Sequence, residues 1–235
     1  MLDRKMVMAK ATWYFVDAKG KLGEVWNLIH WPYTLMVQAY LIMGATLAPE
    51  FHLDRLLPAM LAYFLGLGIA AHAFDQLSKT GSHYVKFLTD RELLVMGLAS
   101  LCTAAGIGIY HAVTIAPLLL VFIAIGAFFV LAYTLPDKIG TNLFHSDISF
   151  AFSFAFMPFL TSYYVNALTI TPQALAFGIP IALTAWVEIV LSRYVRTARK
   201  LGWETERYKP PELALTLLVF LVYSFALASV VWRLA

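Results

Sequence analysis

Charged residues are scarce in this sequence of 235 residues. Only 13% of them are Asp, Glu, Lys or Arg, whereas 61% are apolar, and the mean hydropathy is +0.74. Soluble globular domains contain about 25% charged and about 45–50% apolar residues. A chain with so little charge lacks the polar surface that a water-soluble domain presents to solvent, so the composition excludes that class.

Further absences exclude particular kinds of protein. Cysteine occurs once, at Cys102, which rules out an internal disulfide framework. The last apolar stretch, LALTLLVFLVYSFALASVVW, contains no lysine to carry the Schiff base of a retinal protein. His72 and His111 are expected near opposite membrane faces, so they cannot supply the two axial ligands of one haem. Short alternating segments typical of a transmembrane β-barrel are also missing, which leaves a helical membrane protein.

The apolar residues are gathered in stretches that reach the ~20 residues needed to cross the hydrocarbon core as a helix. Their positions predict an all-α transmembrane bundle that forms one domain, residues 31–235. An N-terminal segment, residues 1–30, precedes it, with an amphipathic interfacial helix between Leu22 and Trp31. We expect about seven spans, at residues 31–49, 56–75, 92–114, 116–135, 148–168, 172–194 and 212–232.

The basic residues predict the orientation of this bundle. With the N-terminus inside, all of the 17 lysines and arginines except Arg55 and Arg233 fall in segments on the cytoplasmic side. Lysine and arginine in short loops resist translocation. We therefore expect a protein integral to the cytoplasmic (plasma) membrane, with its N-terminus in the cytoplasm and its C-terminus outside.

Two ionisable residues lie at the cytoplasmic end of the second expected span, in the segment AAHAFDQL. An ionisable side chain inside a span costs about 2.5–3.5 kcal/mol on insertion scales, which makes each one a candidate for function. His72 and Asp75 are three residues apart and so share one helix face. Together they suit metal coordination, substrate binding or proton transfer, and the alternative is a polar helix end at the membrane interface.

A second group of polar residues lies on the sixth expected span and directly after it. Glu188 is about one turn before the basic run RYVRTARK, where it either contacts a substrate or forms a structural ion pair. If the helix continues past the membrane, Arg193, Arg196 and Lys200 share a face. With Arg199 they are candidates for a diphosphate-binding pocket, and the alternative is contact with anionic lipid headgroups.

Several motifs follow one another in a recognisable order. An interfacial helix leads into HWPYTLMVQAYLIMGATLA, and a second span ends in AAHAFDQL. The segments TDRELLVMGLAS, LAYTLPDKIGTNLFHSD and FMPFLTSYYVNALTITPQALAFGIPIAL follow. This order resembles that of the UbiA superfamily of intramembrane prenyltransferases, from the first span through the Tyr-x-Leu-Pro loop to the fifth and sixth spans. The resemblance covers nearly the whole chain.

The resemblance implies a site at the cytoplasmic face. In that family, two Asp-rich motifs hold Mg²⁺ ions that bridge to a prenyl diphosphate. Asp75 matches the first motif and is thereby a candidate metal ligand, and Lys138 matches a basic loop residue that contacts the diphosphate. Elsewhere the sequence departs from the family: His72, Gln76 and Lys79 stand near the other positions of the first motif. The second motif is replaced by the basic segment SRYVRTARKLG, and seven spans stand in place of the usual nine.

Two functions remain open at this point. One is a divergent enzyme that acts on a prenyl or other lipid diphosphate, with Asp75 and His72 as catalytic residues and with Lys138 and the 193–200 cluster at the headgroup. The other is a non-catalytic relative that binds a lipid, quinone or pigment, or serves as a subunit of a membrane complex. Transport is a third alternative. We expect membrane lipid or prenyl diphosphate as the partner, together with other membrane subunits, and no nucleic acid.

Overall fold

The computed structural model describes residues 14–79, 81 and 83–235, so Arg4, Lys5 and Lys10 of the expected cytoplasmic segment lie outside the described residues. In the described part every regular element is a helix, which confirms the all-α prediction. The elements are α2 (Lys21–Leu28), α3 (Trp31–Leu47), α4 (Leu53–Tyr63), η1 (Phe64–Ala71), α5 (His72–Leu77), α6 (Asp90–Thr114), α7 (Leu119–Thr134), α8 (Pro136–Ile139), α9 (Asp147–Ala151), η2 (Phe152–Phe156), α10 (Met157–Ala167), α11 (Pro172–Lys200) and α12 (Thr205–Leu234).

Each expected span coincides with a helix or a continuous series of helices. Five of them are long and apolar enough to cross a membrane: Leu53–Leu77, Asp90–Thr114, Asp147–Ala167, Pro172–Lys200 and Thr205–Leu234. The other two, α3 and α7, have 17 and 16 residues. At 1.5 Å per residue each is about 25 Å long, slightly less than the ~30 Å hydrocarbon core. A membrane protein is thus supported, and crossing by α3 and α7 stays a prediction.

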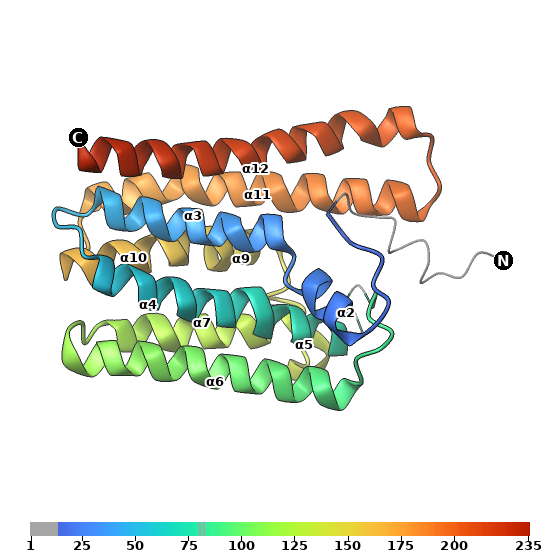
Figure 1. The fold of residues 1–235 in the computed structure, drawn as a ribbon, viewed down its shortest axis with the longest axis horizontal. Helices are drawn as coiled ribbons and strands as arrows, with labels where there is room; N and C mark the ends of the chain where they lie inside the picture. Colours follow the sequence, from blue (N-terminus) through green and yellow to red (C-terminus); the bar gives the residue numbers. More distant parts are fainter. Residues whose placement is uncertain (1–13, 80, 82) are drawn as a thin grey trace.

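The long helices lie side by side in a bundle (Figure 1). Helix α3 packs against α10 and α12, while α6 packs against η1, α5 and α7. The contact between α3 and α10 is close because Gly44 faces the partner backbone, where an added Cβ would overlap the carbonyl oxygen of Phe159. Tyr40 and Phe159 are fully buried in this contact region. Small residues at helix contacts let backbones approach in membrane bundles.

Two helices extend beyond the expected spans. Helix α11 continues to Lys200, past the expected span end at residue 194, and α12 begins at Thr205, before the expected span start at residue 212. Hydropathy measures the apolar length of a span, whereas Arg, Lys and Ala extend a helix readily outside it. An ion pair between Arg199 and Glu212 joins the two extensions.

The expected amphipathic helix is present as α2, which lies at one end of the bundle beside α5 (Figure 1). This end, called the α2 end below, also contains the loop 78–89 and the junction between α11 and α12. Arg55 and Arg233 lie at the opposite end, where Arg233 donates a hydrogen bond to the carbonyl of Pro49. Among the described residues, the basic side chains other than Arg55 and Arg233 therefore belong to segments at the α2 end, and which face meets the cytoplasm stays a prediction.

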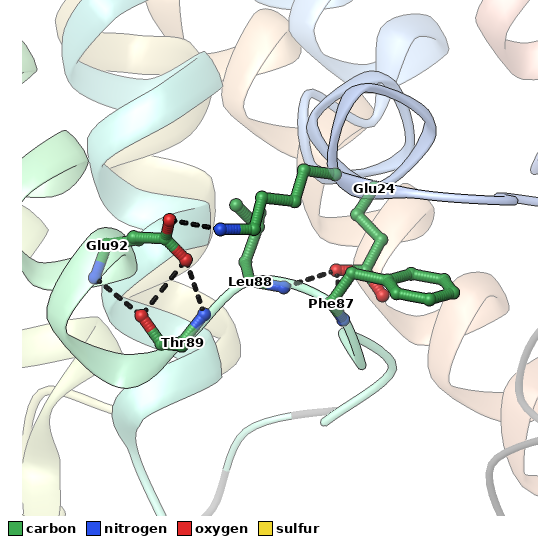
Figure 2. Close-up of polar contacts among 6 residues, drawn as sticks. Glu24, Phe87, Leu88, Thr89 and Glu92 are labelled. Carbon is green, nitrogen blue, oxygen red and sulfur yellow. Dashed lines mark hydrogen bonds and ion pairs between the residues drawn. The ribbon is translucent and has the colours of Figure 1, made fainter.

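Helix α2 holds the loop 78–89 through one carboxylate. Glu24 is only 3% exposed, and its oxygens accept hydrogen bonds from the backbone N–H groups of Phe87 at 2.7 Å and Leu88 at 2.8 Å (Figure 2). They also accept one from the N–H of Lys86. A buried carboxylate is tolerated when donors surround it, and bonds to a charged acceptor are the stronger kind. We call these three bonds the Glu24 clamp.

The first turn of α6 completes this attachment. Thr89 and Glu92 form a capping box, in which the Thr89 side chain accepts from the Glu92 N–H and the Glu92 carboxylate accepts from the Thr89 N–H. Such a box satisfies helix N–H groups that have no partner inside the helix. Lys21 of α2 forms an ion pair with Glu92, so α2 is joined both to the loop and to α6.

Candidate ligand-binding cavity

A polar cavity of about 420 Å³ lies at the α2 end. Residues from α3, η1, α5, α7, α9, η2 and α11 form its wall, together with the segment before α2 and the loop after α5. The wall is unusually rich in titratable groups for a site inside a bundle of apolar helices. They are Tyr14, His30, Tyr33, His72, Asp75, Tyr133, His145, Glu188, Arg193, Arg196 and Lys200.

The structure brings together most of the site residues predicted from the sequence. His72 and Asp75 reach the wall from α5, on the side of the cavity formed by the second span. The others reach it from α11 and are Glu188, Arg193, Arg196 and Lys200. The two groups are close because α5 and α11 pack around one cavity. Their distance along the sequence does not reveal this proximity.

Lys138 and Arg199 are not on this wall. Lys138 lies in α8 with 59% of its side chain exposed, 3.7 Å from Asp137. Arg199 is paired with Glu212, and its guanidinium lies 5.1 Å from the ring centroid of Tyr208. In an α-helix Arg199 is rotated by roughly 60° or more from the face of its basic neighbours, which directs it toward α12.

Helix α11 carries the polar side of the cavity as a regular row. Glu188, Ser192, Arg196 and Lys200 are spaced four residues apart and all reach the wall. Side chains at this spacing follow one face of a helix, and the row is about 18 Å long. Its acidic end lies within the bundle and its basic end at the α2 end. We call it the α11 row.

The basic residues of the cavity differ in their partners. Arg193 forms an ion pair with Asp147 at 2.6 Å, which ties α11 to the first turn of α9. Arg196 donates a long hydrogen bond, 3.4 Å, to the carbonyl of Ser192 one turn earlier. No ion pair among the described residues involves Arg196 or Lys200. These two cations are therefore the ones available to an anionic ligand.

A ring cluster that the sequence did not predict lines the same cavity through Tyr14, His30 and His72. His30 has a left-handed backbone (φ 50°) directly before α3, and its ring stacks on His72 with centroids 4.4 Å apart. Its two nitrogens lie 2.6 Å from the Tyr14 hydroxyl and 2.8 Å from the Tyr84 hydroxyl. These contacts join segments 16 and 54 residues apart, so no local pattern could have revealed them.

His30 and Tyr84 are uncharged at neutral pH. Burial, together with the neighbouring His72, holds the pKa of His30 well below its ordinary value. Burial and then the carboxylate of Asp75 raise the pKa of Tyr84 well above its ordinary value. A neutral imidazole has one donor and one acceptor nitrogen, so one of the two tyrosines donates to His30 and the other accepts from it.

A second, apolar cavity of about 110 Å³ adjoins the polar one. The two share the lining residues Leu67, Phe129, Val130 and Ser153. From there the apolar cavity runs between α4, η1, α6, α7 and α10 toward the end of the bundle away from α2. Along α7 it extends from Val130 to Leu119, about 16 Å of helix, which is roughly half of a membrane's hydrocarbon core.

The acids of the polar cavity do not match a magnesium site of the kind that the family resemblance implies. Mg²⁺ prefers near-octahedral oxygen coordination, and a dimetal diphosphate site needs several carboxylates. Asp75 and Glu188 lie on different helices of the wall, which also carries three basic side chains. Within the described part of the chain, no three His, Cys, Asp or Glu side chains gather as a ligand set. The donors present fit direct contact with an anion better than a metal-bridged one.

Comparisons of the chain with protein-family models, with curated proteins and with solved structures find no match. The resemblance to the UbiA superfamily therefore stays a prediction based on sequence motifs. The chemistry of the site has to be argued from its own geometry.

Proposed function

We propose that this protein binds a membrane amphiphile that has a phosphate or diphosphate head and a single prenyl or other hydrocarbon tail. The head lies in the polar cavity against Arg196 and Lys200, and the tail lies in the apolar cavity. The observation that carries the proposal is the adjacency of these cavities, one with two unpaired cations and the other almost purely apolar. Pockets of this kind typically bury most of a ligand and orient it through few polar groups.

The basic end of the α11 row supports this assignment of the head. Guanidinium and ammonium groups bind phosphate oxygens through charge-assisted hydrogen bonds, and a guanidinium can contact two oxygens at once. Their position at the α2 end lets the head remain near the membrane surface while the tail points into the bundle. The resemblance to intramembrane prenyltransferases agrees with a prenyl tail and belongs to the same proposal.

The proposed function has two versions: in the first the protein converts the ligand chemically, and in the second it only binds the ligand. Asp75 and His72, beside the cavity, support a divergent prenyl transferase or lyase. The lack of a magnesium ligand set among the described residues favours the second version, a non-catalytic UbiA-like protein that holds a lipid. In that version the unpaired cations neutralise the head without a metal.

Equilibrium binding of radiolabelled farnesyl diphosphate to the detergent-purified protein tests the proposal. We expect saturable binding that is weakened at least tenfold in the double variant Arg196→Gln/Lys200→Gln, since a hydrogen bond to a charged group contributes about 1.5–3 kcal/mol. Arg207→Gln is the matched control, because Arg207 is exposed and lies outside the cavity wall. Equal binding by the double variant and this control would refute the proposed head site.

The same sample separates the two versions of the function. Release of inorganic diphosphate during incubation with a membrane lipid extract that supplies prenyl acceptors, lost in Asp75→Ala, would identify an enzyme. Stoichiometric binding that leaves farnesyl diphosphate intact in the presence of that extract, with or without Mg²⁺, would identify a lipid-binding protein. Addition of EDTA shows whether either result depends on a metal.

A further inference from the structure

Glu188 is the most deeply buried titratable residue of the α11 row. Only 2% of it is exposed, although its side chain lines the polar cavity. Its Oε2 atom has no hydrogen-bond partner among the described residues, and none of their ion pairs includes it. A buried acceptor without a donor is unfavourable, and unsatisfied polar atoms are rare in native structures. Glu188 is therefore an acceptor in need of a donor.

Polar groups near Glu188 are directed to other partners. The hydroxyl of Tyr40 lies 2.8 Å from the Thr184 hydroxyl. Arg193, the first arginine after Glu188, is bound to Asp147. Arg196 bonds the backbone of Ser192 and does not reach Glu188 as an ion pair. The packing around Glu188 thus leaves its free oxygen for a group that comes from outside the chain.

The position of Glu188 in the row defines which part of a ligand it would meet. The backbone of Glu188 lies eight residues before that of Arg196, about 12 Å along the α11 axis and farther from the α2 end. The Arg196 side chain reaches back to the Ser192 carbonyl, so its guanidinium lies nearer to Glu188 than the backbone spacing. A ligand whose anionic head contacts Arg196 and whose tail enters the apolar cavity therefore passes Glu188 between head and tail. The donor must lie in that intermediate part of the ligand.

The charge of the cavity favours a neutral donor. Three basic side chains already line the wall, so a ligand ammonium would add positive charge beside them, whereas a hydroxyl satisfies Oε2 without any added charge. We propose that Glu188 accepts a hydrogen bond from a hydroxyl group that the ligand carries between its anionic head and its tail. This inference rests on the proposed function, because it assumes that the head lies at Arg196. It narrows the ligand class to hydroxylated lipid phosphates.

A pair of lipids that differ by one hydroxyl tests the inference. Lauroyl lysophosphatidic acid has a free hydroxyl on the middle glycerol carbon, between its phosphate and its single tail, and its deoxy analogue has hydrogen there. Both are measured by direct binding of the radiolabelled lipid to the purified full-length chain. We expect the hydroxylated lipid to bind about tenfold more tightly, since a site built to bond a hydroxyl discriminates against a ligand that lacks it.

Two substitutions identify Glu188 as the cause of that preference. Glu188→Leu removes the acceptor, and we expect it to bind both lipids equally. Glu188→Gln keeps a carbonyl oxygen, and we expect it to retain most of the preference. Farnesyl diphosphate has no hydroxyl, so its binding to Glu188→Leu, measured on the same sample, shows that the variant is folded.

Equal binding of the two lipids by the wild type would overturn the inference. So would a preference that persists in Glu188→Leu. Neither result affects the proposed head site, which is judged separately by farnesyl diphosphate binding and its loss in Arg196→Gln/Lys200→Gln. If the wild type binds no farnesyl diphosphate, the proposed function itself fails.

Discussion

The Glu24 clamp predicts how firmly the loop 78–89 is held at the α2 end. In Glu24→Ala, the N–H groups of Lys86, Phe87 and Leu88 lose their shared acceptor. Hydrogen bonds to a charged group contribute about 1.5–3 kcal/mol each and are not additive when they share a partner. We therefore expect the free energy for opening this loop to fall by about 3–5 kcal/mol.

Hydrogen exchange of the detergent-purified protein measures this change at the clamp itself. A loss of about 3 kcal/mol corresponds to exchange that is on the order of a hundredfold faster at the three amides. Amides in the middle of α10, far from the clamp, should exchange at the wild-type rate. In Glu24→Gln one carboxylate oxygen is replaced by an amide nitrogen, so we expect a smaller effect.

Glu92→Ala is the informative comparison. It removes the capping box and the ion pair with Lys21 but leaves the Glu24 clamp in place. Exposed caps and ion pairs contribute less than buried charged hydrogen bonds, about 1 kcal/mol or below. Unchanged exchange at Lys86, Phe87 and Leu88 in Glu24→Ala, or an equal effect of Glu92→Ala, would refute the assignment of the loop's stability to this carboxylate.

Three other predictions follow from particular positions. An added Cβ at Gly126 meets no atom within 4 Å, so Gly126→Leu should fill the apolar cavity and weaken binding of farnesyl diphosphate but not of inorganic diphosphate, as measured by equilibrium binding. Gly44→Ala should lower the thermal midpoint by several degrees because its Cβ would overlap the Phe159 carbonyl, while Gly126→Ala should leave it unchanged in the same thermal scan. The hydrogen bond from Ser78 lowers the pKa of Asp137. The stability that this carboxylate contributes is therefore present at neutral pH and is lost as the pH falls below about 4. We expect the free energy of unfolding of Asp137→Asn, measured in an acid titration, to depend less on pH in that range than that of the wild type.

The helices of this protein could be predicted from sequence because each one is a local property of an apolar stretch. The basic end of the α11 row could also be anticipated, since Arg196 and Lys200 are four residues apart on one helix and their spacing defines a common face. The ends of α11 and α12 could not, because polar residues outside an apolar stretch can still be helical.

The spacing of residues along the sequence could not predict how the cavity is assembled. That α5 and α11 both line one cavity depends on packing between distant spans. His30 seemed in the sequence only to begin a span, and its bonds to Tyr14 and Tyr84 arise from chain segments that no periodicity connects. Lys138 was predicted through the family resemblance alone, and the structure places it away from the wall.

The ring of His30 joins three parts of the chain: the segment before α2, the loop after α5, and the second span through His72. A ligand that shifts His72 would change the bonds of His30 to both tyrosines, and so the stability of the contacts that join these segments at the α2 end. Thermodynamic linkage then works in both directions. Any change that stabilises these contacts alters ligand affinity by the same factor by which bound ligand alters the equilibrium for forming the contacts. Binding of ligand in the cavity and ordering of the segments at the α2 end would thus be coupled in a single equilibrium.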